Sequence, residues 1–388
     1  MKKILFIVCI VGVLQAENFE LFLKNAIQNS PYLKANQLNI KQANEQSSIT
    51  TRYKNPSLEL EVSNFAVNNL GNKSGYRSTI TQPIRLWGVS RDREVLASAQ
   101  ITQTKSFVEL SQAKFVLQLS LFYSNYKNAL KAESLAKQEL NISTKILKIS
   151  KARFENGTIA RVKYIQAKVD MRRVENFLNQ MQVKKLSAYY RLISFSGSTK
   201  EINIENDYEF NLNGNNSVVN SAQLTYTKSK TASASALAEL NSNKLEWIDV
   251  YGTFEKEPDQ GIARVGVSIP LVVFNTKSQE KRIAQLEAKK SDLISKNTNN
   301  VLTLRLTNLS KSIVALIKLE KSTSKLLKDQ EELLNMYEDG YKIASINLIE
   351  LQLIKNQMIQ TKAELINIDT QKEQSIIKHN FLTGEYNE

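Results

Sequence analysis

The chain has very few residues of the kinds that carry catalysis, disulfides or bound metal. Its 388 residues include one cysteine, Cys9, and one histidine, His379. It has no glycine-rich phosphate loop and no recognisable carboxylate pair, so neither nucleophilic catalysis nor a His/Cys metal site can be assembled from one chain. The sequence therefore predicts a protein that is not an enzyme, without cofactor or metal, in which His379 is a packing or surface residue.

Glycine, proline and long apolar runs are also scarce. With 12 glycines and 5 prolines, the chain has room for very long helices. Beyond residue 16, no segment approaches the roughly 20 apolar residues that a membrane-spanning helix requires. If the protein enters a membrane, it must therefore do so as a closed β-barrel, because only helices and closed barrels satisfy every backbone hydrogen bond in lipid.

The first sixteen residues have the features of an export signal. Lys2 and Lys3 precede an apolar run over 4–14, and Ala16 stands at a plausible cleavage site. We expect residues 1–16 to be a cleaved signal peptide. Because Cys9 lies inside this segment, the mature chain is predicted to have no thiol and no lipid anchor at a cysteine.

The basic charge of the chain is compatible with more than one kind of binding partner. The formal charge is +14, and without Lys2 and Lys3 there remain 50 basic and 38 acidic residues, or +12. Such a balance is typical of proteins that bind nucleic acid or anionic lipid. Here the lysines are mixed with Glu and Gln along helical stretches of an exported chain. We therefore expect solvated helix faces and no nucleic-acid partner.

The two halves of the chain share landmarks at a constant offset of 187 residues. An internal repeat of this kind indicates one structural unit packed against its copy. The landmark pairs are Pro83 and Pro270, Trp87 and Phe274, Ala97 and Ala284, Phe154 and Tyr341, Gly157 and Ala344, and Gly197 and Gly384.

The first structural repeat is predicted over 17–197 and the second over 218–388, joined by an Asn-, Ser- and Gly-rich linker at 198–217. The predicted elements of the first repeat are a helix over 18–52, a β-hairpin over 57–85, a long helix over 89–155, a tip at 156–163 and a return helix over 160–195. Those of the second are a helix over 219–246, a β-hairpin over 247–270, a long helix over 276–340, a tip at 343–350 and a helix to 382. The sequence is compatible with two positions for the second turn, 341–344 or 337–340. The turn could have Ala344 at its bend, as the repeat offset indicates, or the glycine Gly340 one helical turn earlier.

The strands alternate apolar and polar residues with period two. In the strand over 247–254, Ile248, Val250 and Phe254 share one face, and Asp249 and Thr253 share the other. This pattern fits a barrel with a lipid-facing outside and a wet lumen. It fits a soluble antiparallel sheet with one buried face equally well.

Four strands cannot close a barrel around a channel. If the strands lie in a membrane, the chain must form an oligomer, and a trimer supplies twelve. The long helices repeat their apolar residues at coiled-coil spacing and reach roughly 100 Å. The predicted fold class is mainly α with a small β part, internally duplicated.

Five segments in order resemble the TolC-type outer-membrane efflux family, and the likeness covers nearly all of the mature chain. These segments are Asn55 to Glu61 followed by Ser63 to Phe65; Thr81 to Pro83 with Leu86 to Gly88; Arg153 and Phe154 through Gly157 to Ala167; Val265 to Leu271; and Leu382 to Gly384. Within the family, the strand ending at Phe65, the Trp87-Gly88 pair and the segment from Ser268 to Leu271 look most like the cobalt-zinc-cadmium and copper-silver branch.

The resemblance implies a homotrimer with a twelve-stranded barrel in outer-membrane lipid and a long helical barrel across the periplasm. It implies a passive exit duct of a tripartite pump, served by a periplasmic adaptor and an inner-membrane transporter of the RND type. Heavy-metal cations are the cargo of the branch it resembles. A multidrug or type I secretion duct, or a periplasmic coiled-coil scaffold without a pore, are the alternatives.

The resemblance also assigns the candidate site to the two tips. The expected adaptor-docking residues are Gly157, Thr158, Ile159, Arg161, Val162, Ala344, Asn347 and Leu348. The expected aperture residues are Lys163, Tyr341 and Glu350. Lys163 and Glu350 are repeat mates of opposite charge, so they either close the aperture across a ring of alternating repeats or are solvated surface charges.

Overall fold

The computed structural model describes residues 17–67, 71–212 and 214–387. The predicted signal peptide over 1–16, with Cys9, lies outside these residues. The chain divides into two compact units, which we describe separately. The tip unit contains Met1–Lys34, Ser111–Ser221 and Leu302–Glu388, and the sheet unit contains Ala35–Leu110 and Ala222–Val301.

The described residues form seven helices and four strands. In chain order they are α1 (Phe19–Asn29), α2 (Pro31–Thr51), β1 (Ser57–Val67), β2 (Gly71–Arg85), α3 (Trp87–Glu155), α4 (Arg161–Ser196), α5 (Ala222–Leu240), β3 (Trp247–Lys256), β4 (Gly261–Ser268), α6 (Ser278–Lys342) and α7 (Leu348–Thr383). The predicted fold class, mainly helical with a small β part, is confirmed. Within the described ranges, no helix combines the length and the apolar character needed to cross a membrane.

The internal duplication is confirmed by the backbone. Both ends of α7 lie 187 residues after the corresponding ends of α4. Gly197 and Gly384 end these helices with φ of 79° and 89°, in the left-handed region that glycine adopts without strain. The second half therefore repeats the backbone of the first.

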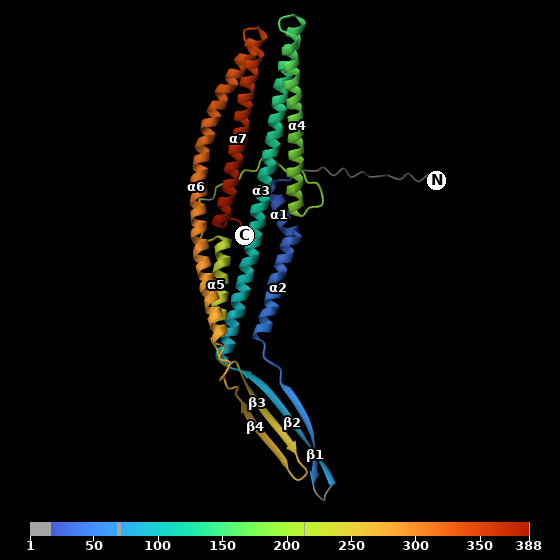
Figure 1. Ribbon diagram of the computed structural model, residues 1–388, viewed down its shortest axis with the longest axis vertical. Helices are drawn as coiled ribbons and strands as arrows, with labels where there is room; N and C mark the ends of the chain where they lie inside the picture. The colour runs from blue at the N-terminus through green and yellow to red at the C-terminus, as the bar shows by residue number, and fades with distance from the viewer. Residues whose placement is uncertain (1–16, 68–70, 213, 388) are drawn as a thin grey trace, which may run out of the picture. The chain divides into compact units, whose positions relative to one another are not determined.

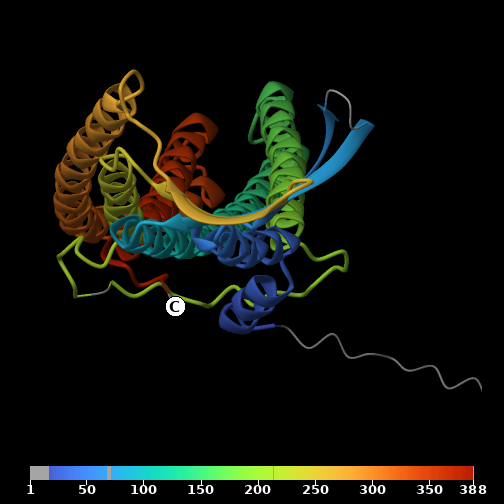
Figure 2. The ribbon, with the colours of Figure 1, turned by 90° about the horizontal axis from the view of Figure 1, so that it is seen from below.

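Four helices of the tip unit run side by side. Figure 1 shows them in the order α6, α7, α3 and α4, and the same order is seen from below in Figure 2. Hydrogen bonds and ion pairs join α3 to α7, α3 to α4, and α6 to α7; examples are Asn128 to Thr370, Lys185 to Glu133, and Lys372 to Glu320. The two central helices, α3 and α7, thus come from different repeats, while α4 and α6 lie on the flanks.

An aromatic core ties the amino-terminal helix of the tip unit to its long helices. Phe19 of α1 stacks on Tyr123 of α3, with ring centroids 4.2 Å apart, and Tyr208 and Phe210 pack around them. The Tyr123 hydroxyl donates to the carbonyl of Glu205 at 2.9 Å, and burial raises its pKa above the usual value. The segment between the repeats is therefore packed onto the helices through its aromatic residues.

Two helices differ from the sequence prediction. The helix expected over 18–52 is interrupted, because α1 ends at Asn29 and α2 begins at Pro31. Proline has no backbone N–H and favours the first helical position, so it starts a new helix here. The helix expected over 219–246 ends at Leu240, where the Asn-Ser-Asn sequence at 241–243 begins. Such residues favour helix ends, and the Asn243 amide donates to Asp92 at 2.8 Å.

The sheet unit contains one antiparallel sheet in the order β1-β2-β3-β4. Its register places Leu58 opposite Ile80, Ile80 opposite Gly252, and Gly252 opposite Val265. The neighbouring row passes from Glu59 through Thr79 and Thr253 to Arg264. One face of the sheet is therefore apolar and the other polar, as the period-two alternation predicted.

Candidate functional site: the hairpin tips and the two-faced sheet

The first tip is a tight turn between α3 and α4. Gly157 has φ of 68°, and the N–H of Thr158 donates to the carbonyl of Arg153 at 2.8 Å. The Thr158 hydroxyl donates to the same carbonyl, also at 2.8 Å. These bonds satisfy one of the carbonyl groups that the end of α3 leaves without a helical partner, as a left-handed helix cap does.

The second tip repeats this turn with a different residue at its bend. Ala344 has φ of 69°, and the N–H and hydroxyl of Ser345 both donate to the carbonyl of Gly340 at 3.0 Å. Since α6 continues to Lys342, the turn lies at 343–347, and Gly340 is inside the helix. The two tips are thus structural mates, although an alanine stands at the strained position of the second.

Asn347 caps the second tip together with Glu350. The Asn347 side chain accepts from the N–H of Glu350 at 3.0 Å and donates to the Glu350 carboxylate at 2.7 Å. This arrangement satisfies an open N–H at the start of α7 and places a negative charge where the helix dipole favours it. Glu350 therefore stabilises its own helix start.

The predicted tip residues differ in exposure. Gly157, Thr158, Arg161 and Val162 are exposed, and Ile159 is half-buried. On the second tip Ala344, Asn347 and Glu350 are exposed, whereas Leu348 and Tyr341 are buried in an apolar cluster with Ile146 and Leu351. Two exposed apolar residues, Ile343 and Ile349, were not predicted, although Ile349 is the repeat mate of Val162.

Tyr341 joins the two hairpins below the tips. Its side chain is only 1% exposed, and its hydroxyl lies 2.8 Å from Ser150 Oγ on α3. Arg153 donates to the Tyr341 carbonyl at 2.9 Å, and its guanidinium lies 4.7 Å from the ring centroid. Sequence reasoning identified Tyr341 but not Ser150 and Arg153, because residues that meet across two helices are not adjacent in the chain.

A buried lysine forms a second link between the hairpins. Lys355 of α7 is 0% exposed and donates to Asp170 of α4 at 2.6 Å and to Ser143 of α3 at 3.0 Å. Glu139 lies 3.8 Å from its ammonium group, and burial raises the pKa of Glu139. The expectation that the lysines lie on solvated faces is therefore wrong for Lys355. It is also wrong for Lys127, which ion-pairs with Glu373.

Lys163 and Glu350 lie on different hairpins of the tip unit. Lys163 is half-buried near the start of α4, and Glu350 is exposed at the start of α7. In the part of the chain that the structure describes, no ion pair joins them.

The sheet carries a row of alternating charges on its polar face. Arg77 of β2 donates to Glu61 of β1 at 2.8 Å and to Glu255 of β3 at 2.7 Å, and Arg264 of β4 donates to Glu255 at 2.5 Å. Each guanidinium thus links neighbouring strands. On the opposite face the apolar side chains remain uncovered, with Val62 84% and Val265 87% exposed.

The fold defined by these elements is that of outer-membrane channels. The structure of the outer-membrane channel OprN superposes with a TM-score of 0.82 at 10% identity, covering 95% of this chain and 90% of that one. A structure of CusC, reported for its folding and transmembrane channel formation, gives 0.80 at 12%, covering 96% and 95%. The CmeC outer membrane channel of Campylobacter jejuni gives 0.78 at 14%, covering 95% and 86%.

The sequence itself matches a family over part of its length. Residues 22–198, a little less than half of the chain, match the family described as outer membrane efflux protein. A search of curated proteins gives no significant match. The matched region covers nearly all of the first repeat, so the duplicated backbone extends the same structure to the second.

Proposed function

We propose that this chain is a TolC-type outer membrane efflux protein, one subunit of a trimeric exit duct of a tripartite pump. The observation that carries the proposal is the sheet, with an uncovered apolar face and a charged, hydrogen-bonded face on four strands. A lipid-facing barrel requires this pairing of faces. A soluble sheet would cover its apolar face, so the uncovered face argues against the periplasmic scaffold.

The test is the oligomeric state in detergent. Because four strands cannot close a barrel, we expect the purified chain to be a trimer that resists mild detergent. Val265→Arg should reduce trimer yield and outer-membrane recovery, since an arginine on a lipid-facing strand costs about 2–4 kcal/mol near the bilayer centre. Val265→Leu is the matched control and should behave as wild type. A monodisperse monomer with intact strands would contradict the proposal.

The tips are the proposed adaptor-docking surface. Gly157, Thr158, Ile159, Arg161 and Val162 of the first tip are the proposed contacts, with Ala344 and Asn347 of the second. Leu348 supports this surface from below, because its side chain is buried. Small and apolar residues at a helical turn present a surface on which another helical hairpin can pack.

Lys163, Glu350 and Tyr341 are the proposed aperture residues. We expect Glu350→Lys to raise the passive leak, measured as single-channel conductance in a planar bilayer, since it places lysines opposite lysines. The swap Lys163→Glu with Glu350→Lys should restore the closed level. Glu350→Gln is the control for capping, because glutamine can still accept from Asn347 without its charge. Unchanged conductance in Glu350→Lys would show that these two charges do not close the aperture, and Tyr341 would be the next residue to test.

We propose heavy-metal cations as the cargo. The proposal rests on the resemblance of the strand ending at Phe65, of Trp87-Gly88 and of Ser268 to Leu271 to the heavy-metal branch. A multidrug or type I secretion duct has the same fold and remains the second candidate. Identifying the inner-membrane transporter that works with this chain, for example from the neighbouring genes, would distinguish the two, because the transporter selects the cargo. The duct needs no nucleotide of its own.

A further inference from the structure

An elongated groove lies in the tip unit between α4 and α7, with α3 as its floor. Its volume is about 600 Å³, within the range that is typical of pockets for small molecules. It is lined from Asn128 to Glu139 on α3, from Arg173 to Lys184 on α4, and from Asn356 to Asn367 on α7. Each of these stretches spans about 16 Å at 1.5 Å per residue. The groove is therefore long and narrow, and all its walls come from one chain.

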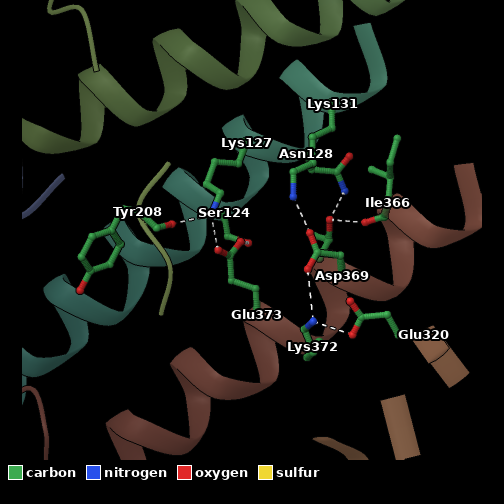
Figure 3. A network of polar contacts seen from close by, with 11 residues as sticks. Ser124, Lys127, Asn128, Lys131, Tyr208, Glu320, Ile366, Asp369, Lys372 and Glu373 are labelled. Carbon is green, nitrogen blue, oxygen red and sulfur yellow. Dashed lines mark hydrogen bonds and ion pairs between the residues drawn. The ribbon is translucent and has the colours of Figure 1, made fainter. Parts of the chain in front are cut away.

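The two side walls meet at the end of the groove that is nearer the tips. There Lys355 of α7 donates to Asp170 of α4 at 2.6 Å. Further from the tips, α7 contacts α3 through polar pairs, which join Lys127 to Glu373, Lys131 to Asp369 and Asn128 to Thr370 (Figure 3). Thr370 also donates to the carbonyl of Ile366 at 2.7 Å. Asn128 and Ile366, which line the far end, are therefore held in place by hydrogen bonds.

The middle of the groove is apolar. Leu135 of α3 and Val174 and Met181 of α4 are buried, and Ile359 of α7 is half-buried. Phe177 is 41% exposed at the edge, where its ring can cover a bound apolar group. A molecule with an apolar body that enters the groove therefore removes both its own surface and these side chains from water.

Amide side chains bound this apolar lining at both ends. Asn356 lies at the end nearer the tips, and Asn128 and Asn367 lie at the far end. A partner helix packed along the hairpins would need an apolar stripe that continues beyond three turns. A lining that ends after about 16 Å suits a small molecule instead, and the amides offer it both donors and acceptors.

The charges of the lining are divided between its two ends. Near the tips, Arg173 pairs with Asp170 at 2.8 Å, and Glu139 lies 3.8 Å from the ammonium group of Lys355. At the far end, Lys184 is exposed and makes no ion pair with any residue that the structure describes. An anionic group beside Lys184 would therefore gain a charge-assisted hydrogen bond without displacing an existing partner.

We infer that this groove binds an elongated amphiphilic anion, with its apolar body on Leu135, Phe177 and Met181 and its anionic group beside Lys184. The inference goes beyond the proposed duct, because passive conduction requires no molecule bound between the helices of its wall. Since the walls belong to both hairpins, the bound molecule contacts α4 and α7 together. It therefore stabilises the packing of the two hairpins through the free energy of its binding.

A pair of fluorescent probes tests the recognition of the anion. Anilinonaphthalene sulfonate is an elongated aromatic anion, and phenylnaphthylamine has the same rings without the sulfonate. Each is titrated into the full chain in lipid nanodiscs, and the signal of empty nanodiscs is subtracted. We expect saturable binding of the sulfonate to the wild-type chain. Lys184→Gln should weaken it about three- to fivefold, as the loss of an exposed ion pair does, and should leave binding of the uncharged probe unchanged.

Two matched controls assign the binding to the groove. Arg172→Gln removes an exposed cation of α4 outside the lining and should bind both probes as the wild type does. Ala363→Trp fills the groove from its exposed rim and should abolish saturable binding of both probes. Gln357→Trp places the same side chain on α7 outside the lining and should leave binding intact. The circular dichroism of each variant checks that its helices are formed.

Three results would overturn the inference. Wild-type binding in a folded Ala363→Trp variant would place the probe on another surface. An equal loss in Lys184→Gln and Arg172→Gln would show that the sulfonate responds to the overall charge and not to Lys184. Absence of saturable binding to the wild-type chain would leave the groove without a small-molecule ligand of this class. Each of these results is independent of the oligomeric state, so the proposed duct is tested separately.

Discussion

Gly157→Arg is expected to reduce efflux to the level of a strain without the duct, while export and trimer formation remain intact. The reason is steric and electrostatic, because a long charged side chain at the first tip would occupy the surface proposed for the adaptor. Apart from its chain neighbours, no described residue has a heavy atom within 4 Å of the position that a Cβ at Gly157 would take, so there is space for the side chain and the tip should still form. Efflux is measured as cargo accumulation in cells that carry the wild-type pump and adaptor.

Gly157→Ala is the matched control for this variant. Any residue with a Cβ at φ of 68° is strained by about 1–2 kcal/mol, and alanine has that strain without the bulk. Ala344 shows that the same turn accommodates an alanine at φ of 69°. Efflux should therefore persist in Gly157→Ala. Wild-type efflux in Gly157→Arg would place adaptor docking on another surface.

Lys355→Met is expected to destabilise the tip unit by about 1.5–3 kcal/mol, because the half-buried carboxylate of Asp170 loses its ammonium partner and keeps only the exposed Arg173. The measurement is the midpoint of thermal unfolding, followed by the circular dichroism of the helices. Adding Asp170→Leu should recover much of the loss, since replacing a whole buried ion pair with apolar residues is often neutral.

Lys378→Met is the control on the same helix. Lys378 is exposed on α7, so its replacement should change stability by no more than about 0.5 kcal/mol. If Lys355→Met unfolds at the same temperature as Lys378→Met, the ion pair with Asp170 contributes nothing to stability. In that case the two hairpins would be held together by their other contacts, among them the apolar cluster around Tyr341 and the ion pair of Lys127 with Glu373.

The sequence correctly predicted those helices and strands whose apolar residues recur with a strong periodicity. The offset of 187 residues predicted the mates Gly157 and Ala344, and both have the same left-handed backbone. The alternation around Ile248 and Val250 predicted the two faces of the sheet. The same periodicity missed the break at Pro31, because a proline at the first helical position does not disturb the apolar pattern on either side of it.

The contacts between hairpins could not be predicted from the sequence. A repeat shows which residues are mates, but not which helix of one repeat packs on which helix of the other. Lys127 and Lys355 were therefore predicted to be solvated charges, because their carboxylate partners, Glu373 and Asp170, are distant from them in the sequence. The polar contacts between α3 and α7 became visible only when the two helices were seen side by side.

The spacing of the paired charges on α3 and α7 limits how the two hairpins can move past each other. Lys127 and Lys131 are four residues apart on α3, and Asp369 and Glu373 are four residues apart on the antiparallel α7. A slide of one residue breaks both ion pairs and restores neither. A slide of four residues, about 6 Å, brings a lysine back to a carboxylate. We therefore expect any sliding of the two hairpins past each other to proceed in steps of about four residues, with an ion pair formed at each stop.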